Sequence, residues 1–407
     1  MFKFNFDVDD DLDTESPFVD VTAAQPGEGA SEPPKAAEAS KQFVEVPLSD
    51  LLSALPPAIS YSPLVIHASS GRSIALAKRD LFDARFQLIS AEAADDTSGT
   101  DGRPSALDFV DAPSDLVSGV YEGGLKTWEC SLDLAGCLDG VLEGQVAEHL
   151  KGKRVLELGC GTAVPTMYLL QELLAASSSE PLNVQLHLQD YNDLVFRLVT
   201  IFNLLLAWYM SPASRAFREN HDGPNSAPDQ QDPLPPADAT VPGELPISPE
   251  LVEAFQGSLK QRGIEIHFFC GSWDTFDLQY AGGKYNIVLT SETIYRPESL
   301  PSLITLMSQA CIGDAQASGD SIDEEKPLEV LASERLTISE RSNVHYLCLV
   351  AAKLVYFGVG GGVSEFVRAV EHPEEEAQPS GRRKPSVQHL WERKEGVKRT
   401  VMRVSWL

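Results

Sequence analysis

The strongest structural signal in this 407-residue chain is the stretch Val155-Leu156-Glu157-Leu158-Gly159-Cys160-Gly161-Thr162-Ala163-Val164-Pro165. An apolar run rich in branched residues leads into a glycine-containing turn, and a segment with helical character follows over 166–176. This pattern is typical of a buried parallel strand that enters a tight loop and then a helix. Glycine lets a bound molecule approach the backbone, and the first N–H groups of the helix face that molecule. The stretch therefore predicts a ligand-binding loop.

Three interpretations of this loop compete, the simplest being an ordinary turn that glycine only closes. A dinucleotide site requires Gly or Ala at the last place of G-x-G-x-x-G, where this chain has Val164, and a phosphate-binding loop requires Gly-Lys-Ser/Thr, which is absent. The remaining pattern is E-x-G-x-G-x-(G/A), made by Glu157, Gly159, Gly161 and Ala163. A negative charge at Glu157 suits a cationic ligand without phosphates. The pattern resembles the first motif of class I S-adenosylmethionine-dependent methyltransferases.

Composition narrows the classes of partner. The formal net charge of −28 argues against broad binding to nucleic-acid phosphates and favours a basic protein partner. The six cysteines form no C-x-x-C pair, so we expect neither a metal site nor a disulfide framework. No apolar run reaches the roughly 18 residues of a membrane helix, and the N-terminus lacks a signal-peptide core. We expect a monomer in the cytoplasm and nucleus.

The chain is expected to contain one main domain with additions. A disordered acidic tail covers 1–42, an N-terminal extension and linker cover 43–115, and the main domain covers 116–407. Acidic or proline-rich stretches without periodicity predict disordered insertions at about 210–249, 313–343 and 371–385.

Strand-like and helix-like segments alternate through the main domain. The strands are expected at Val155–Leu158, Val184–Gln189, Ile264–Phe269, Asn286–Thr290 and Ala352–Phe357. The helices are expected at Asn192–Tyr209, Pro297–Ile312 and Ser364–Val370, and a final hairpin at Val387–Arg393 and Val397–Val404. This alternation predicts an α/β fold with a mostly parallel sheet that ends in an antiparallel hairpin.

Polar residues follow the second and third predicted strands. Asp190 ends the second strand, where a parallel sheet presents a carboxylate to a ribose, with Tyr191 and Asn192 beside it. The alternative role for Asp190 is to balance the dipole of the following helix. The third strand is followed by Gly271-Ser272-Trp273, whose indole either stacks on a purine or packs in the core.

Two further segments are expected beside the same carboxyl ends of the predicted strands. Thr290-Ser291-Glu292-Thr293-Ile294-Tyr295 follows the fourth strand, where substrate meets cofactor in open α/β sheets. Glu292 and Tyr295 line a pocket in this interpretation, and in the alternative they are a capping acid and a packed ring. Gly123-Gly124-Leu125-Lys126-Thr127-Trp128-Glu129-Cys130 precedes the first strand by one helix and is expected to close over the ligand.

Taken in order, these segments resemble the histidine protein methyltransferase family. The resemblance covers roughly 116–407 without the insertions, and the acidic, Phe-rich N-terminus is also similar. Lysine-specific relatives usually carry Asp-x-x-Tyr after the fourth strand, whereas this chain has Glu292, which fits the histidine branch better. The motifs that carry the resemblance are G-G-L-K-T-W-E-C, V-L-E-L-G-C-G-T-A-V-P, Q-D-Y-N, G-S-W, T-S-E-T-I-Y and Y-F-G-V-G-G-G-V-S-E-F.

The resemblance implies a seven-stranded Rossmann-like fold, S-adenosylmethionine as cofactor, and methylation of the tele nitrogen of a histidine in a large-subunit ribosomal protein. It implies no metal. The implied catalytic residues are Glu292 and Tyr295. The implied cofactor-binding residues are Lys126, Thr127, Trp128, Glu129, Glu157, Gly159, Cys160, Gly161, Asp190, Tyr191, Asn192, Gly271, Ser272, Trp273 and Ser291.

Our mechanistic hypothesis is that Glu292, or a carbonyl of the 358–362 loop, accepts the imidazole N–H while Tyr295 positions the ring. The strongest alternative is a lysine methyltransferase of the same fold. A non-catalytic ribosome assembly factor that keeps the fold is a second alternative. A small-molecule methyltransferase is third, because no dedicated lid domain is evident.

Overall fold

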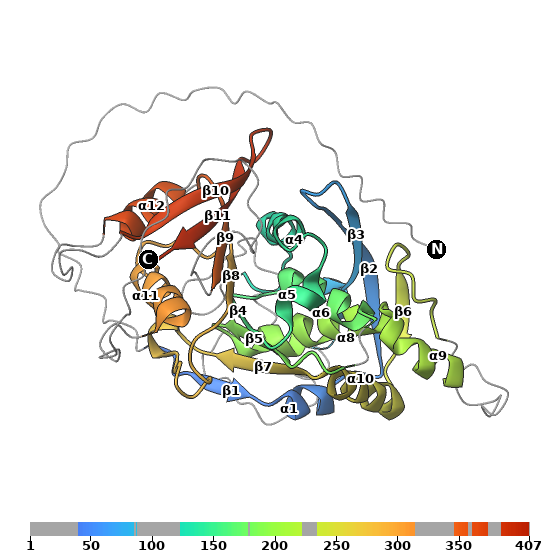
Figure 1. Ribbon diagram of the computed structural model, residues 1–407. Coiled ribbons are helices and arrows are strands. Elements are labelled where there is room, and N and C mark those ends of the chain that lie inside the picture. Colours follow the sequence, from blue (N-terminus) through green and yellow to red (C-terminus); the bar gives the residue numbers. More distant parts are fainter. Residues whose placement is uncertain are drawn as a thin grey trace, which may run out of the picture. The chain divides into compact units, whose positions relative to one another are not determined.

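Buried strands of branched residues build a mixed eight-stranded sheet in the computed structural model (Figure 1). Its five central strands run parallel, and the pairings at both margins are antiparallel. The structure describes residues 40–84, 87, 123–177, 180–221, 234–313, 346–356, 360–372 and 384–406. The strands, in order across the sheet, are β1 (Val44–Val46), β7 (Ile264–Cys270), β5 (Val184–Asp190), β4 (Arg154–Leu158), β8 (Ile287–Ser291), β9 (Leu347–Lys353), β11 (Arg399–Ser405) and β10 (Ser386–Arg393).

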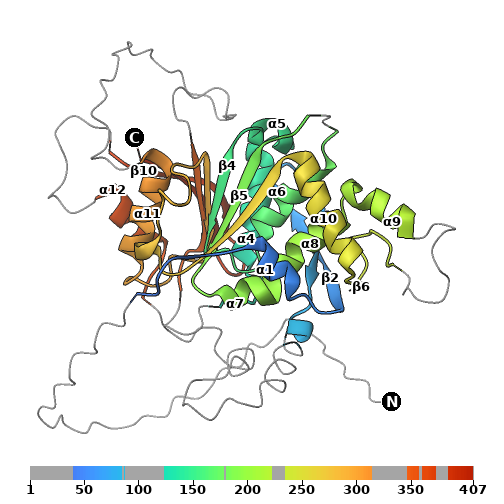
Figure 2. The ribbon, with the colours of Figure 1, turned by 90° about the horizontal axis from the view of Figure 1, so that it is seen from below.

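Helices cover both faces of the sheet, so its central strands are apolar on both sides (Figure 2). Within β4, Val155 packs into the core of one face, whereas Leu156 and Leu158 pack into the core of the other. The first face carries α4 (Glu129–Val141), α5 (Val146–Leu150), α6 (Val164–Ala175), α8 (Ile201–Tyr209) and α10 (Pro249–Arg262). The second face carries α11 (Leu300–Ile312) and α12 (Val363–Glu371).

The N-terminal extension adds a strand to the eight-stranded sheet and also forms part of a second, three-stranded sheet. Its β1 pairs with β7 at the edge, which gives the sheet eight strands where seven were expected. After α1 (Leu48–Ser53), β2 (Ala58–His67) and β3 (Ser73–Arg79) form a second, antiparallel sheet with β6 (Gly243–Pro246). This sheet packs on α4 and α8, and its residues Ile59 and Leu76 are fully buried in the same hydrophobic core.

The expectation that 210–249 lacks regular structure was wrong for its described residues. A 3-10 turn, η2 (Pro212–Ser214), leads into α9 (Arg215–His221), and β6 pairs with β2. The fully buried Leu245 anchors β6 in the core. Most of the other two predicted insertions, and the tail through residue 39, lie outside the described residues.

Two predicted elements differ in the structure. The fifth strand is β9, which begins five residues earlier than expected and ends at Lys353. The single helix expected over 192–209 is divided into α7 (Asp193–Val195), a π-helical segment η1 (Phe196–Thr200), and α8. Inside the π-helical turn, the Thr200 hydroxyl donates to the carbonyl oxygens of Val195 (3.2 Å) and Gly161 (2.7 Å). π-helical turns often occur at functional sites.

No single helix in the described part of the chain is both long and apolar enough to cross a membrane. One bent pair, Asp193–Tyr209 with Pro212–His221, meets the requirement by length and composition alone.

Candidate functional site

The loops that carry the predicted site residues meet at one edge of the sheet. The strand order reverses between β4 and β8, because β5 and β7 lie on one side of β4 while β8 and β9 lie on the other. Ligands of open α/β sheets bind beside the carboxyl ends of the strands at such a reversal. The loops after β4, β5, β7 and β8 therefore form the candidate site.

The loop after β4 needs its glycines for two reasons. Gly159 and Gly161 have φ angles of +61° and +50°, in the left-handed region that L side chains rarely adopt. A Cβ on Gly159 would lie 2.6 Å from Thr293 Cγ2, and one on Gly161 would lie 3.1 Å from the carbonyl oxygen of Gly124. The glycines thus allow the loops after β8 and before α4 to pack directly on this turn.

Glu157 is a supporting residue, which corrects the expectation that it presents a charge to a ligand. Its side chain is 2 % exposed, and one carboxyl oxygen accepts hydrogen bonds from the backbone N–H (3.0 Å) and the hydroxyl of Thr166, in the first turn of α6. Burial raises the pKa of Glu157 to about 8, despite these hydrogen bonds. The carboxyl is therefore mostly protonated at neutral pH and holds the start of α6.

Asp190 closes the glycine loop from the end of β5. Its Oδ2 accepts the N–H of Gly161 at 2.9 Å, and its Oδ1 accepts the N–H of Asn192 at 3.3 Å. Burial raises the pKa of Asp190 to about 6, and these backbone hydrogen bonds oppose that rise. The predicted neighbours have local roles as well: Asn192 caps α7 by accepting from Leu194 N–H (3.1 Å), and the Tyr191 ring lies 5.6 Å from the Lys41 ammonium.

Gln189 joins the loops after β4 and β7, a role that the sequence reasoning missed. Its Oε1 accepts the Trp273 indole N–H at 2.8 Å and the Gly159 backbone N–H at 3.3 Å, while its Nε2 donates to Gly271 O at 2.8 Å. The Trp273 ring is therefore held beside the glycine loop. Gln189 directly precedes Asp190 in the Q-D-Y-N motif, which was the available signal.

The chain segment before β1 lies along the loop after β7. Backbone groups of Lys41 exchange hydrogen bonds with Ser272, from Lys41 N–H to the hydroxyl (2.9 Å) and from Ser272 N–H to Lys41 O (2.9 Å). The Thr275 hydroxyl donates to the same Lys41 carbonyl at 2.9 Å. A Cβ on Gly271 would lie 2.5 Å from Gln42 O, so this close approach requires glycine.

The loop before α4, which carries Lys126, Thr127, Trp128 and Glu129, contacts the glycine turn. The Thr127 and Thr162 hydroxyls are hydrogen-bonded at 3.2 Å, and the Trp128 indole N–H donates to Gly123 O at 3.0 Å. The ammonium of Lys126 lies 5.1 Å from the centre of the Trp128 ring. The fourth residue, Glu129, starts α4.

Buried side chains of η1 and α8 donate hydrogen bonds to carbonyl oxygens of the glycine turn. Besides the Thr200 hydroxyl on Gly161 O, Asn203 Nδ2 donates to Thr162 O at 2.8 Å. Cys160 is 6 % exposed, and its N–H donates to Gln189 O at 2.9 Å. The turn is thus preorganised by hydrogen bonds from two neighbouring segments.

Glu292, beside Ser291 at the end of β8, combines strain, burial and an unsatisfied acceptor. Its φ of +57° is rare for a residue with a Cβ and is typical of positions that a functional site holds under strain. Its side chain is 8 % exposed, Oε2 accepts the Tyr356 hydroxyl at 2.8 Å, and Oε1 is buried without a hydrogen-bond donor. The Lys353 ammonium lies 3.6 Å from Oε1.

Tyr295, three residues after Glu292, lies in the same region of the site. Its ring centre is 6.1 Å from that of Tyr356. Its carbonyl accepts the N–H of Gly361 at 3.0 Å, and a Cβ on Gly361 would clash with that carbonyl. The glycine-rich loop before α12 is thereby tied to the loop after β8.

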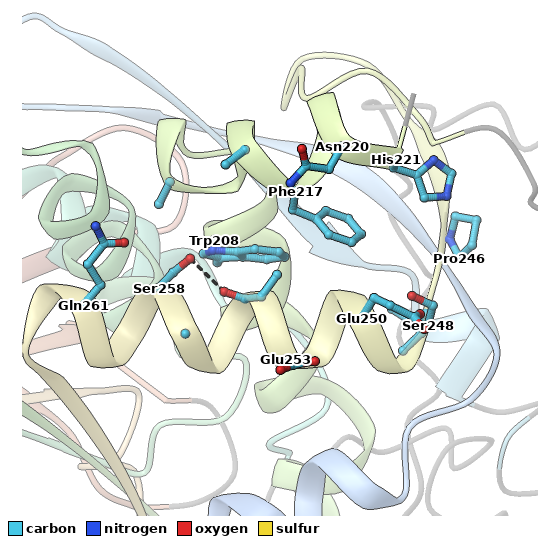
Figure 3. Close-up of a pocket in the computed structure, with 15 residues that line it drawn as sticks. Trp208, Phe217, Asn220, His221, Pro246, Ser248, Glu250, Glu253, Ser258 and Gln261 are labelled. Atoms are coloured by element: carbon cyan, nitrogen blue, oxygen red, sulfur yellow. Dashed lines mark hydrogen bonds between the residues drawn. The ribbon is translucent and has the colours of Figure 1, made fainter. Parts of the chain in front are cut away.

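A pocket of about 840 Å³ lies elsewhere, between α8, α9 and α10 (Figure 3). Trp208 and Phe217 line it opposite α10, and Glu250, Glu253 and Gln261 come from α10. None of the predicted site residues lines this pocket.

Fold and site together define an α/β protein of Rossmann-like topology, with a ligand site where the strand order reverses. No protein-family model matches the chain. Histidine protein methyltransferase 1 of Schizosaccharomyces pombe is 32% identical over 324 residues, which cover 78% of this chain and 74% of that protein. The Saccharomyces cerevisiae protein of the same name is 30% identical over 301 residues, covering 72% of this chain and 67% of that protein. The chain belongs to the histidine protein methyltransferase family.

More distant relatives and solved structures are also similar. The Bos taurus histidine protein methyltransferase 1 homolog is 27% identical over 63% of this chain and 51% of its own length. A ribosomal protein L11 methylase from Lactobacillus delbrueckii subsp. bulgaricus is 10% identical with a TM-score of 0.25, over 70% of this chain and 83% of that chain. A putative RNA methyltransferase from Pyrococcus horikoshii is 10% identical with a TM-score of 0.27, over 79% of this chain and 96% of that chain.

Proposed function

We propose that this chain transfers the methyl group of S-adenosylmethionine to the tele nitrogen of a histidine in a large-subunit ribosomal protein. The observation that carries the proposal is the buried Glu292 Oε1, which has no hydrogen-bond donor and lies at the ligand edge of the sheet. A buried acceptor left without a donor costs about 1–3 kcal/mol. A neutral imidazole has one N–H that would satisfy this oxygen and one lone pair left to react.

The residues around the glycine turn fit S-adenosylmethionine. Backbone N–H groups of Gly161, Asn192 and Tyr191 hydrogen-bond to the Asp190 carboxylate. Its two oxygens offer about four acceptor sites, so a lone pair remains for a ribose hydroxyl. The Trp273 N–H is satisfied by Gln189, so the partly exposed ring can stack on a purine without leaving a donor unpaired. The left-handed Gly159 and Gly161 bring bare backbone to the same place.

When bound, S-adenosylmethionine supplies a methyl group that its sulfonium already activates. The chain has to align a ring nitrogen with that methyl group and exclude water. A histidine with a pKa near ~6.5 is largely neutral at cellular pH. Glu292 accepts the N–H of one ring nitrogen, which directs the lone pair of the other toward the methyl group, and Tyr295 positions the ring. Glu292 then stabilises the imidazolium product.

The ribosomal substrate is supported by charge and by the sequence resemblance. A chain with a formal net charge of −28 is electrostatically suited to a basic protein. We infer that the enzyme acts as a monomer in the cytoplasm and nucleus.

Glu292→Gln tests this function, because the amide keeps the size of the side chain but lacks its charge. The substrate is total ribosomal protein from cells that lack the enzyme, and the readouts are the rate of transfer and the position of the methyl group on the ring. We expect a rate at least tenfold below wild type, whereas Glu298→Gln, at an exposed position of the same loop, keeps the wild-type rate. Full rate and unchanged nitrogen selectivity in Glu292→Gln would refute the role of this acid. Methyl-lysine as the product would favour the lysine alternative.

A further inference from the structure

Lys353, the last residue of β9, lies between two segments of the candidate site, the loop after β8 and the segment at the start of α4. Its ammonium lies 3.6 Å from Glu292 Oε1, 3.5 Å from Glu129 Oε2, and 4.7 Å from the centre of the Trp128 ring. Glu292 belongs to the loop after β8, whereas Trp128 and Glu129 belong to the predicted cofactor loop. The Lys353 side chain is 18% exposed, so its charge is only partly screened by water.

Tyr356 fixes the other side of the same carboxylate. Its hydroxyl donates to Glu292 Oε2 at 2.8 Å and accepts the backbone N–H of Lys353 at 3.2 Å. Burial and the charge of Glu292 raise the pKa of Tyr356 well above its usual value, so the phenol remains a donor. The fully buried Cys130 thiol also faces Glu292, and burial together with that charge raises its pKa. Both groups therefore stay neutral, and Lys353 provides a positive charge beside Glu292.

In the proposed complex, the protonation state of the Glu292 carboxyl determines which imidazole tautomer binds. An ionised carboxylate can only accept a hydrogen bond, so it selects the ring nitrogen that carries the proton and leaves the lone pair facing the methyl group. A protonated carboxyl would donate to the lone pair, and the N–H would then face the methyl group. That second complex cannot react at the tele nitrogen. A neighbouring cation favours the ionised form of the acid.

We propose that Lys353 and Tyr356 are positioning residues that keep Glu292 an ionised, oriented acceptor and thereby select the reactive histidine tautomer. This proposal rests on the proposed function. Lys353 acts through its charge, and Tyr356 acts by holding Oε2. Neither residue needs to touch the ring.

The test compares Lys353→Met, which removes the charge but keeps an apolar stem, with Lys353→Arg, which keeps the charge. The kcat/KM for methyl transfer to total ribosomal protein from cells lacking the enzyme is measured between pH 5.5 and 9 as a ratio to wild type. Protonation of the substrate histidine affects all variants equally, so it cancels in this ratio. Lys353→Met removes a positive charge that lies 3.6 Å from Glu292 Oε1. We therefore expect the Lys353→Met ratio to be at least severalfold lower at the acidic end and to rise toward one at the alkaline end.

Lys353→Arg is expected to follow the wild-type profile, and Lys260→Met, at an exposed position of α10, is the control for charge removal. Tyr356→Phe is expected to raise the proportion of pros-methylated product at least severalfold, measured by amino-acid analysis of hydrolysed substrate. A purely structural role would lower activity equally at every pH, with no change in the methylated nitrogen, and that result would overturn the proposal. So would a Lys353→Met profile identical to wild type. If the wild-type enzyme labels no histidine, the proposed function itself fails and this inference fails with it.

Discussion

The buried carboxyl of Glu157 gives a prediction about stability that needs no ligand. Its pKa of about 8 in the folded chain compares with an ordinary value of 4.5. Below about pH 4.5 both the folded and the unfolded chain hold this proton, so the group contributes nothing. Between these two values the unfolded chain releases the proton while the folded chain keeps it. The free energy of unfolding therefore falls as the pH rises, and the loss levels off above about pH 8.

The substitution Glu157→Gln removes this titration while keeping an oxygen that can accept from Thr166. At 1.36 kcal/mol for each pKa unit, the rise to about 8 corresponds to a change of about 3–5 kcal/mol between the acid and alkaline limits. Glu157→Gln should thus resemble wild type near pH 4.5 and become progressively more stable than wild type toward pH 8. The nearby charge of Asp190 contributes part of the rise in pKa and is present in both proteins.

The assay is urea unfolding followed by tryptophan fluorescence at pH 5, 6, 7 and 8. The control is Glu148→Gln, at an exposed position of α5, whose profile should run parallel to wild type. A stability difference between Glu157→Gln and wild type that stays constant over this range would refute the reasoning, because Glu157 would then titrate alike in both states.

Three further predictions concern the ligand edge. Gly161→Ala should destabilise the chain by about 1–3 kcal/mol and weaken S-adenosylmethionine binding, because φ is +50° and the new Cβ meets backbone. In the control Gly144→Ala, φ is +68° and the new Cβ lies in open space, so only the conformational cost of about 1 kcal/mol is expected. Urea unfolding measures the change in stability, and calorimetric titration measures the affinity. Trp273→Phe loses the hydrogen bond to Gln189 and should weaken cofactor binding severalfold in the same titration, and unchanged affinity would contradict its placement. The wild-type affinity for S-adenosylmethionine should fall as the pH drops through about 6, where Asp190 takes up a proton. Asp190→Asn should bind the cofactor at least tenfold more weakly, with little pH dependence. A wild-type affinity that is constant from pH 5 to 8 would exclude the ribose role of Asp190.

The centre of the fold follows from local sequence. Runs such as Val155–Leu158 and Ile264–Phe269 are apolar without interruption because helices cover both faces of the sheet, and this property identifies buried parallel strands directly. The glycine turn and Asp190 were likewise predictable, because their positions in the strand order place them at one edge. The hydrogen bonds that these residues form could not be predicted from the local sequence.

The parts that sequence reasoning missed depend on contacts between distant segments. Strand β6 lies in a stretch rich in proline and acidic residues, and only its pairing with β2 and the burial of Leu245 make it a strand. Gln189 and Asn203 look like ordinary strand and helix residues, yet their side chains hold the glycine turn. Lys353 was overlooked because the fifth strand was placed five residues too late, which hid a lysine at its carboxyl end.

The central claim is methyl transfer from S-adenosylmethionine to a histidine of a large-subunit ribosomal protein. Its most direct test incubates the purified full-length chain and labelled S-adenosylmethionine with lysate from cells that lack this protein, followed by mapping of the labelled residue by mass spectrometry. We predict a single major labelled protein of the large ribosomal subunit, modified as tele-methylhistidine. Label on lysine, or cofactor binding without any transfer to ribosomal particles, would contradict the claim.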